Sequence, residues 1–362
     1  MKIKKHHLLT INKLLIEAAV AIGFTLIIWL IYVSVSVANN KVQIGSSYMT
    51  MNNEFYPLLN EQVANYVEER KGLLYSRDPA LSVNKQVDEI HSFVNKQVNA
   101  IILNPVDGKS PKLNKAIAAA HKEGTKIVIV DSPVKTKQVD CTILSDNYKA
   151  GQLCAKTLMS KKKEAKILLL THPTALSAVD RINGFTDTIK KSHNHNYQIV
   201  GRISTFGQSE YSYPRVKKFI QNGNKFDTIM ALNDRTAVGA LAAIDTEHQT
   251  GKIKVYSVDG SKDMKKMLGV NKSAQVTVAQ FPIEMGNLAA KVAYKLIDGK
   301  KVPKKIILPV KTITTKNDTK KFKSTIQFNA MAQFCSCFKH CNPNFIYQSI
   351  YQSKSIILSI FD

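Results

Sequence analysis

Arginine is scarce in this sequence, although the chain is strongly basic. The 362 residues include 51 lysines and arginines against 27 acidic residues, and only six of the 51 are arginine. Proteins that read nucleic acids favour arginine, because its planar guanidinium bonds bidentately to phosphates and base edges. The scarcity therefore argues against a nucleic-acid partner. The scattered lysines indicate a solvated basic surface, or else one that is attracted to an anionic cell wall or membrane.

Sequence motifs of catalysis are also missing. The chain contains no nucleophile elbow, no phosphate-binding P-loop and no helix with metal-ligand spacing. The carboxylates that stand at the ends of predicted strands are isolated rather than paired for acid-base work. We therefore expect a protein that is not an enzyme and that needs no cofactor.

Cysteine is rare, with five residues in the chain. None lies just after the apolar N-terminal segment, so a lipoprotein anchor is not expected. Cys141 and Cys154 stand in apolar surroundings and are expected to be buried free thiols. The segment Cys335–Cys341 holds the other three cysteines and His340, which are metal-binding residue types, but in no established ligand spacing. No metal site is predicted.

One long apolar run is present, from Leu14 to Ala38, with Glu17 as its only charge. About 20 apolar residues suffice to cross a bilayer as a helix. Residues 1–13 are basic, which keeps them in the cytoplasm and places the remainder outside. The run is therefore predicted to be a transmembrane anchor. Cleavage after Ser36-Val37-Ala38 is the alternative, although the run is longer than a usual signal-peptide core.

Beyond the anchor, short apolar runs alternate with segments of helical periodicity, the pattern of a parallel sheet with crossover helices. The predicted strands are Val42–Ser46, Leu73–Ser76, Ala100–Leu103, Lys126–Val130, Ala165–Leu170, Ile199–Ser204, Thr228–Leu232, Lys254–Val258 and Gln275–Ala279. The predicted helices are Phe55–Val67, Val83–Val98, Lys112–Lys122, Lys149–Met159, Ala178–Lys190, Arg235–Asp245 and Ile283–Ile297. So many strands predict two doubly wound parallel-sheet lobes joined by a hinge.

The expected boundaries follow from this alternation. Residues 41–147 and 281–315 are assigned to an N-terminal lobe, and residues 148–280 to a C-terminal lobe. Residues 316–362 lack the alternation and are expected to be an appendage outside the fold. The chain should cross between lobes near Asp146–Tyr148, near Gln280–Pro282 and again shortly before the fold ends.

Polar side chains gather just after the predicted strands. In open parallel sheets, ligands bind outside the carboxyl ends of the strands, so these positions are candidates for a binding site. They offer amides, carboxylates and rings suited to a hydroxylated ligand. Each has a structural alternative as a helix cap, a turn residue or, for Arg181, a surface ion pair. The candidates are Asn52, Asn53, Phe55, Tyr56, Asn104, Asp131, Arg181, Asn233, Asp234, Asp259 and Gln280.

The order of several motifs resembles the sugar-binding periplasmic proteins of the ribose-binding type, whose ligand domain is shared with regulators of the lactose-repressor family. The resemblance covers about Val42 to Ile313 and includes MNNEFY, IVIVDSPV, RINGF, ALNDRTAVGALAAI, VYSVDGS and TVAQFP. It implies a type I periplasmic binding protein that closes on its ligand. The implied ligand-binding residues are Asn53, Phe55, Tyr56, Asn104, Asp131, Arg181, Asn233, Asp259 and Gln280, with Phe206 as the opposing ring.

One residue departs from the pattern, since Ser132 stands where the ribose-binding type has arginine. A missing donor in a buried polar site changes which hydroxyls are tolerated. The resemblance thus implies a monosaccharide or a similar polar solute, but not ribose itself. The expected role is delivery to an ABC importer; the alternative is an anchored sensor that signals to a membrane histidine kinase. A transcription regulator is excluded, because the predicted anchor occupies the place of the DNA-binding helices.

Overall fold

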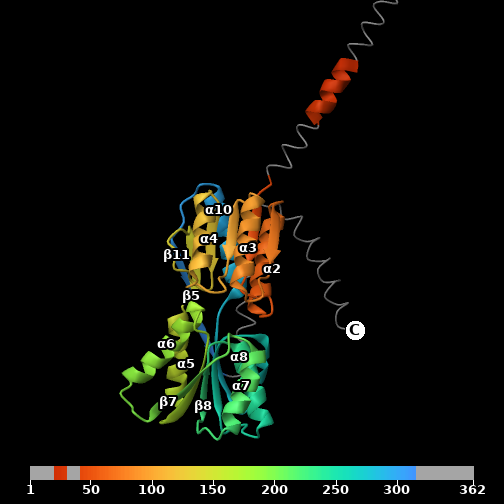
Figure 1. The fold of residues 1–362 in the computed structure, drawn as a ribbon. Helices are drawn as coiled ribbons and strands as arrows, with labels where there is room; N and C mark the ends of the chain where they lie inside the picture. Colours follow the sequence, from red (N-terminus) through yellow and green to blue (C-terminus); the bar gives the residue numbers. More distant parts are fainter. Residues whose placement is uncertain (1–19, 31–40, 315–362) are drawn as a thin grey trace, which may run out of the picture.

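The computed structural model describes residues 20–30 and 41–314 (Figure 1). Residues 20–30 are helical. Within these two ranges, no helix has the length and apolarity needed to cross a membrane. The remainder of the predicted anchor, and the tail with Cys335–Cys341, lie outside the described residues. The anchor therefore stays a prediction.

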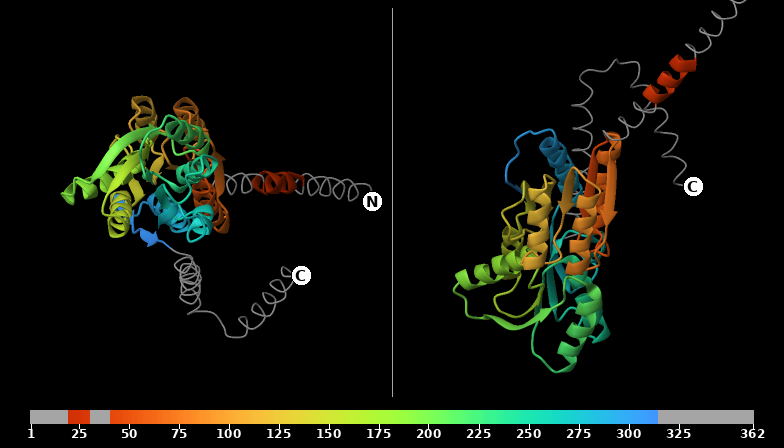
Figure 2. Two further views of the ribbon diagram at one scale, coloured as in Figure 1. Left: turned by 90° about the horizontal axis from the view of Figure 1, so that it is seen from below. Right: turned by 45° about the horizontal axis from the view of Figure 1, so that its top comes forward.

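Two separate sheets form the body of the protein, one in each lobe, with helices on both sides of each (Figures 1 and 2). In the first sheet, neighbouring strands are parallel throughout. Its order is β11 (Lys305–Leu308), β5 (Cys141–Ser145), β4 (Lys126–Val130), β3 (Ala100–Leu103), β1 (Gln43–Ser47) and β2 (Leu73–Arg77).

The second sheet is parallel except at one edge, where β12 runs antiparallel to β10. Its order is β12 (Lys311–Ile313), β10 (Ala274–Ala279), β9 (Lys254–Asp259), β8 (Thr228–Ala231), β6 (Ala165–Thr171) and β7 (Tyr197–Ser204). Because parallel strands direct their carboxyl ends to one edge, each sheet gathers its strand-end residues there.

Helices cover both faces of each sheet, and the strand sequences reflect this. In β3, Ala100 and Ile102 pack into the cluster that contains α2 and α10 residues, while Ile101 and Leu103 pack with residues of α3 and α4. A strand buried on both faces reads as a continuous apolar run, which is why these strands were recognisable. The helices are α2 (Phe55–Glu69), α3 (Val83–Asn95), α4 (Pro111–Lys122), α5 (Asn147–Lys161), α6 (Leu176–Lys191), α7 (Ser209–Gln221), α8 (Asp234–Thr246), α9 (Lys262–Met267) and α10 (Pro282–Ile297).

The two-lobed α/β architecture is thus confirmed. The chain passes between sheets after β5, after β10 and again between β11 and β12. The expectation that all of residues 281–315 lie with the first lobe is wrong for β12, which pairs with β10 of the second sheet. This edge strand has only three residues and begins with exposed Lys311, so its sequence pattern carries little signal.

The sequence pattern also missed β5, β11, α7 and α9. Strand β11 is a short, partly exposed edge strand with lysine at its start. Helix α7 contains Pro214 in its interior, a residue that normally argues against a helix, and α9 is only six residues long. Cys141 and Cys154 are free and buried, as expected.

Candidate functional site

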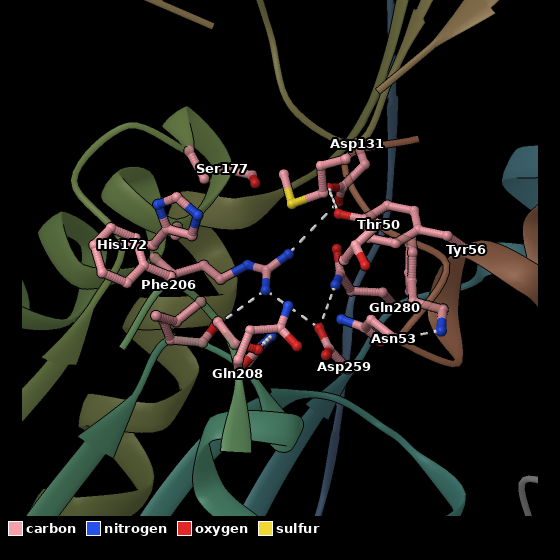
Figure 3. A pocket seen from close by; sticks show the side chains of 18 residues that line it. Thr50, Asn53, Tyr56, Asp131, His172, Ser177, Phe206, Gln208, Asp259 and Gln280 are labelled. Atoms are coloured by element: carbon pink, nitrogen blue, oxygen red, sulfur yellow. Dashed lines mark hydrogen bonds and ion pairs between the residues drawn. The ribbon is translucent and has the colours of Figure 1, made fainter. Parts of the chain in front are cut away.

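A cleft lies between the carboxyl edges of the two sheets, and residues of both lobes line it (Figure 3). It encloses about 430 Å³ of space outside the protein atoms, open solvent included. All the ligand-binding residues that the family resemblance implies line it except Asn104, whereas the further candidates Asn52 and Asp234 do not. Their role in ligand binding stays a prediction.

Arg181, on α6, occupies the centre of the cleft and bridges the lobes. Its Nη1 atom donates to the Asp259 carboxylate at 3.2 Å and to the Leu232 carbonyl at 3.0 Å. Its Nη2 atom lies 3.6 Å from Oδ1 of Asp131 in the other lobe. Nε donates to Oδ1 of Asn147 at 2.8 Å, which fixes the plane of the guanidinium. The alternative of a surface ion pair is wrong, because Arg181 is only 4% exposed.

Asp131 follows β4 and receives bonds on its other oxygen. The Tyr56 hydroxyl donates to Oδ2 at 3.1 Å, and the Asn104 amide donates to the same atom at 3.3 Å. Asn104 is completely buried behind the carboxylate, so it positions Asp131 rather than lining the cleft. Desolvation raises the pKa of Asp131, and the Arg181 guanidinium opposes that shift.

Asp259 ends β9 and accepts a bond from Nε2 of Gln280 at 2.7 Å. Burial raises the pKa of its carboxyl to about 8, against the pull of Arg181. Both strand-end carboxylates have positive φ, 62° at Asp131 and 137° at Asp259. Side chains other than glycine adopt such backbone conformations at a cost, and strain of this kind is concentrated at functional sites.

Aromatic rings lie on both sides of the cleft. Phe55 and Tyr56 meet edge to face in the first lobe, with ring centroids 5.4 Å apart. Phe206 comes from the second lobe, where it contacts His172 and Tyr211 edge to face. Opposed rings of this kind can stack against the apolar faces of a sugar.

The predicted amides have two roles, because they cap helices and also line the cleft. Oδ1 of Asn53 accepts from the Phe55 amide at 3.1 Å, and Oδ1 of Asn233 accepts from Thr236 at 2.9 Å. Asp234, in contrast, bonds to Ser257, Thr277 and the Ser261 amide behind the cleft. Its role is therefore structural, although the cap of α8 is Asn233 rather than Asp234.

Several residues that line the cleft were not predicted from the sequence. Except for Leu232, which follows β8, they stand after β6 or β7 or in the loop after β1, where the sequence shows no distinctive motif. His172 could have been predicted, because it directly follows β6 just as Asp131 directly follows β4. The missed residues are Met49, Thr50, His172, Ala175, Ser177, Ala178, Gly207, Gln208 and Leu232.

The lobes touch across the mouth of the cleft. The Lys262 amide donates to Glu54 at 3.0 Å, and Lys109 donates to the Pro173 carbonyl at 3.1 Å. Deeper inside, the Ser177 amide donates to the Ser132 hydroxyl at 3.3 Å. Together with the Asp131–Arg181 pair, these contacts describe a closed arrangement.

The buried His172 should make the stability of the protein depend on pH. Burial lowers its pKa to about 4, so the unfolded chain binds the proton more readily than the folded one. Stability should therefore fall as the pH is lowered from about 6.5 toward 4, by up to about 1.4 kcal/mol per pH unit. Urea unfolding of His172→Gln across this range should show a flatter profile. The exposed His91→Gln should keep the wild-type slope; an unchanged slope in His172→Gln would contradict the assignment.

The described residues contain no group of three or more histidine, cysteine or acidic side chains arranged to hold a metal ion. The cleft instead offers hydrogen-bond donors and acceptors beside aromatic rings. This arrangement suits the binding of a small hydroxylated molecule.

Comparison with known proteins agrees with this geometry. Residues 44–301 match the family model described as periplasmic binding protein domain. The ribose import binding protein RbsB of Bacillus subtilis (strain 168) is 29% identical over 276 residues, which cover 75% of this chain and 87% of that protein. The relatives are named as binding proteins rather than enzymes, which agrees with the expected absence of catalysis.

Solved structures give the same result. An ABC transporter solute binding protein from Agrobacterium vitis with bound D-fucose is 28% identical, with a TM-score of 0.71, covering 76% of this chain and 96% of that one. A solute binding protein from Bacillus halodurans C-125 with bound myo-inositol superposes with a TM-score of 0.72, covering 78% and 98%. At 18% identity it supports the fold alone.

Proposed function

Because the chain belongs to the periplasmic binding protein domain family, we propose that it captures a monosaccharide or a similar polyol outside the cytoplasm and delivers it to an ABC importer. The observation that carries the proposal is the convergence of strand-end polar residues from both lobes on one cleft. Carboxylates accept hydroxyl hydrogen bonds, while amides both donate and accept. Together these carboxylates and amides can replace the hydrogen bonds that water makes to the hydroxyls of a polyol.

Hinge closure is the proposed mechanism. Asp131 and Tyr56 come from the first lobe, whereas Arg181 and Asp259 come from the second. A ligand that bonds to both groups contacts its full set of partners only when the lobes are closed. It therefore shifts the equilibrium toward the closed form by its higher affinity for that form.

Ser132 supports a ligand other than ribose. Its hydroxyl accepts a bond from the Ser177 amide of the opposite lobe, so it serves the contact between the lobes. A short hydroxyl cannot replace the bidentate donor of an arginine. We propose that the cleft selects a polyol whose hydroxyls do not require that donor.

Residues 14–38 are proposed to anchor the protein in the cell membrane, with residues 1–13 in the cytoplasm. An uncleaved anchor favours a second candidate function, a sensor that reports occupancy to a membrane histidine kinase. Identifying whether importer or kinase genes adjoin this gene discriminates between the two roles. Recovery of the full-length chain, rather than a shortened one, from membranes tests the anchor itself.

A sugar screen tests the binding function. Thermal unfolding of the purified full-length chain in mild detergent, followed by circular dichroism, should shift upward with at least one monosaccharide or polyol. Asp131→Ala and Asp259→Ala should each abolish the shift, because each removes a charged hydrogen-bonding partner worth about 1.5–3 kcal/mol. Asp263→Ala removes an exposed carboxylate on α9 and should leave the shift intact. The absence of any shift, or shifts that survive both cleft substitutions, would refute the assignment.

A further inference from the structure

The charges that line the cleft do not balance. Asp131 and Asp259 are the carboxylates that line it, and Arg181 is the one side chain among the described lining residues that is permanently cationic. His172 is neutral near pH 7, because burial lowers its pKa to about 4. The lining is therefore one positive charge short of its carboxylates, and without a cationic ligand a proton on Asp259, whose pKa is about 8, makes up the difference near pH 7.

Arg181 cannot compensate for both carboxylates. Its donors are already shared among Asn147, the Leu232 carbonyl, Asp259 and Asp131, and the Asp131 contact is the longest of these at 3.6 Å. Buried Asp234 lies close enough to Asp259 to raise the pKa of that carboxyl further. Asp131 also receives bonds from the Tyr56 hydroxyl and the Asn104 amide. Asp259, with Asp234 behind it, is therefore the carboxylate whose buried charge is the more costly.

A second, independent observation lies beside Asp259. Gln280 is only 5% exposed, and its Oε1 atom has no hydrogen-bond partner among the described residues. Its amide orientation is set by Nε2, which donates to Oδ1 of Asp259 at 2.7 Å. The side-chain bonds that described residues make to Asp259 both fall on that same Oδ1 atom. Gln280 and Asp259 thus present unused acceptors to the cleft (Figure 3).

Asp259 and Gln280 offer acceptors without partners, and the lining is one positive charge short. A positively charged donor would satisfy both. We propose that the ligand is a polyol bearing a basic amine, an amino sugar or an amino cyclitol, whose ammonium group lies between Asp259 and Oε1 of Gln280. This inference rests on the proposed function and narrows its ligand class. An ammonium supplies several donors and the missing charge at once. A hydroxyl in the same place supplies one donor and leaves Asp259 protonated.

Matched ligand pairs test the inference. Calorimetric titration of the full-length chain in mild detergent compares D-glucosamine with D-glucose, D-galactosamine with D-galactose, and an amino-deoxy-inositol with myo-inositol. The titrations are run about one unit below the usual pKa of an α-amino group, so that each amine is protonated. At least one amine should bind about tenfold or more tightly than its hydroxyl parent, because charge-assisted bonds exceed neutral ones.

Asp259→Asn keeps the shape of the side chain and removes its charge, so it should eliminate the preference for the amine. Asp263→Asn removes an exposed carboxylate four residues away and should preserve that preference. Titrations in two buffers of different ionisation enthalpy should show proton release when the amine binds, because its charge ionises Asp259, and none with its hydroxyl parent. Binding of neutral polyols alone, or an amine preference that survives Asp259→Asn, would overturn the inference and leave the proposed function standing. Failure of both ligand classes to bind would overturn both.

Discussion

Replacing Arg181 with methionine should lower the free energy of unfolding by about 3–5 kcal/mol, because the substitution leaves buried carboxylates without their counter-ion. Arg181 is 4% exposed, and its guanidinium is the cation between Asp131 and Asp259. Methionine retains much of the apolar volume of the arginine stem. The loss should therefore reflect missing charge and hydrogen bonds rather than an empty cavity.

The stability lost in Arg181→Met should depend on pH, and the loss should grow as the pH rises. The folded-state pKa values of Asp131 and Asp259 are both raised above the ordinary value, that of Asp259 to about 8. A carboxyl whose folded pKa is raised destabilises the fold progressively as the pH rises through that pKa. Without Arg181 both values should rise further, so the deficit should be small near pH 4 and grow toward pH 8.

Urea unfolding at several pH values measures this effect. The matched control is Arg202→Met, which removes an exposed arginine from β7 and should change stability by less than about 0.5 kcal/mol. A deficit in Arg181→Met that is equal at low and high pH would mean that packing, not charge, explains the loss. The variant should also fail to bind any ligand of the wild-type chain, since Arg181 joins the two sides of the cleft.

Replacing Gly151 with alanine should destabilise the protein by about 3 kcal/mol through overpacking. Gly151 lies where α5 crosses α6, and a Cβ atom there would stand 1.9 Å from the Arg181 carbonyl oxygen and 2.7 Å from the Phe185 nitrogen. Both neighbours are backbone atoms, so neither can rotate away. The helices must separate, and α6 would take Arg181 with it.

The sign of the stability change in Gly151→Ala distinguishes a crowded helix crossing from an uncrowded one. Alanine has a higher helix propensity than glycine by about 1 kcal/mol, so an uncrowded site would be stabilised by the substitution. Lys156→Ala, at an exposed position on the same helix, should be nearly neutral. Denaturant unfolding gives the stabilities, and ligand titration should show weaker binding for Gly151→Ala. A stabilised variant would contradict the close helix crossing.

Much of this fold could be predicted, because parallel strands covered on both faces are continuously apolar. The run of residues 100–103 is an example, with alternate side chains packed against opposite helix layers. The same regularity located the candidate site. Strand ends in a parallel sheet share one edge, which is why Asp131, Asp259 and Gln280 could be assigned to one site without any contact being known.

Other features could not be predicted, because the sequence around them carries no pattern that indicates them. Strand β12 pairs with β10 only because the chain returns to the second lobe at its end, and edge strands carry weak patterns. The buried position of Asn104 behind Asp131 depends on how β3 and β4 lie side by side. His172 and Gln208 are cleft residues only because the second lobe faces the first across the cleft.

The sequence by itself determined the alternation of strands and helices, the two-lobed class and the set of strand-end polar residues, because each depends on the periodicity and position of residues along the chain. The tertiary structure decided how those residues share their charges. The sequence identified Arg181 as a donor, but it did not show that Arg181 serves two carboxylates at once. Nor did it show that Oε1 of Gln280 has no hydrogen-bond partner in the described part of the chain. Electrostatic balance depends on distance and burial, and folding alone brings residues 131, 181, 259 and 280 together.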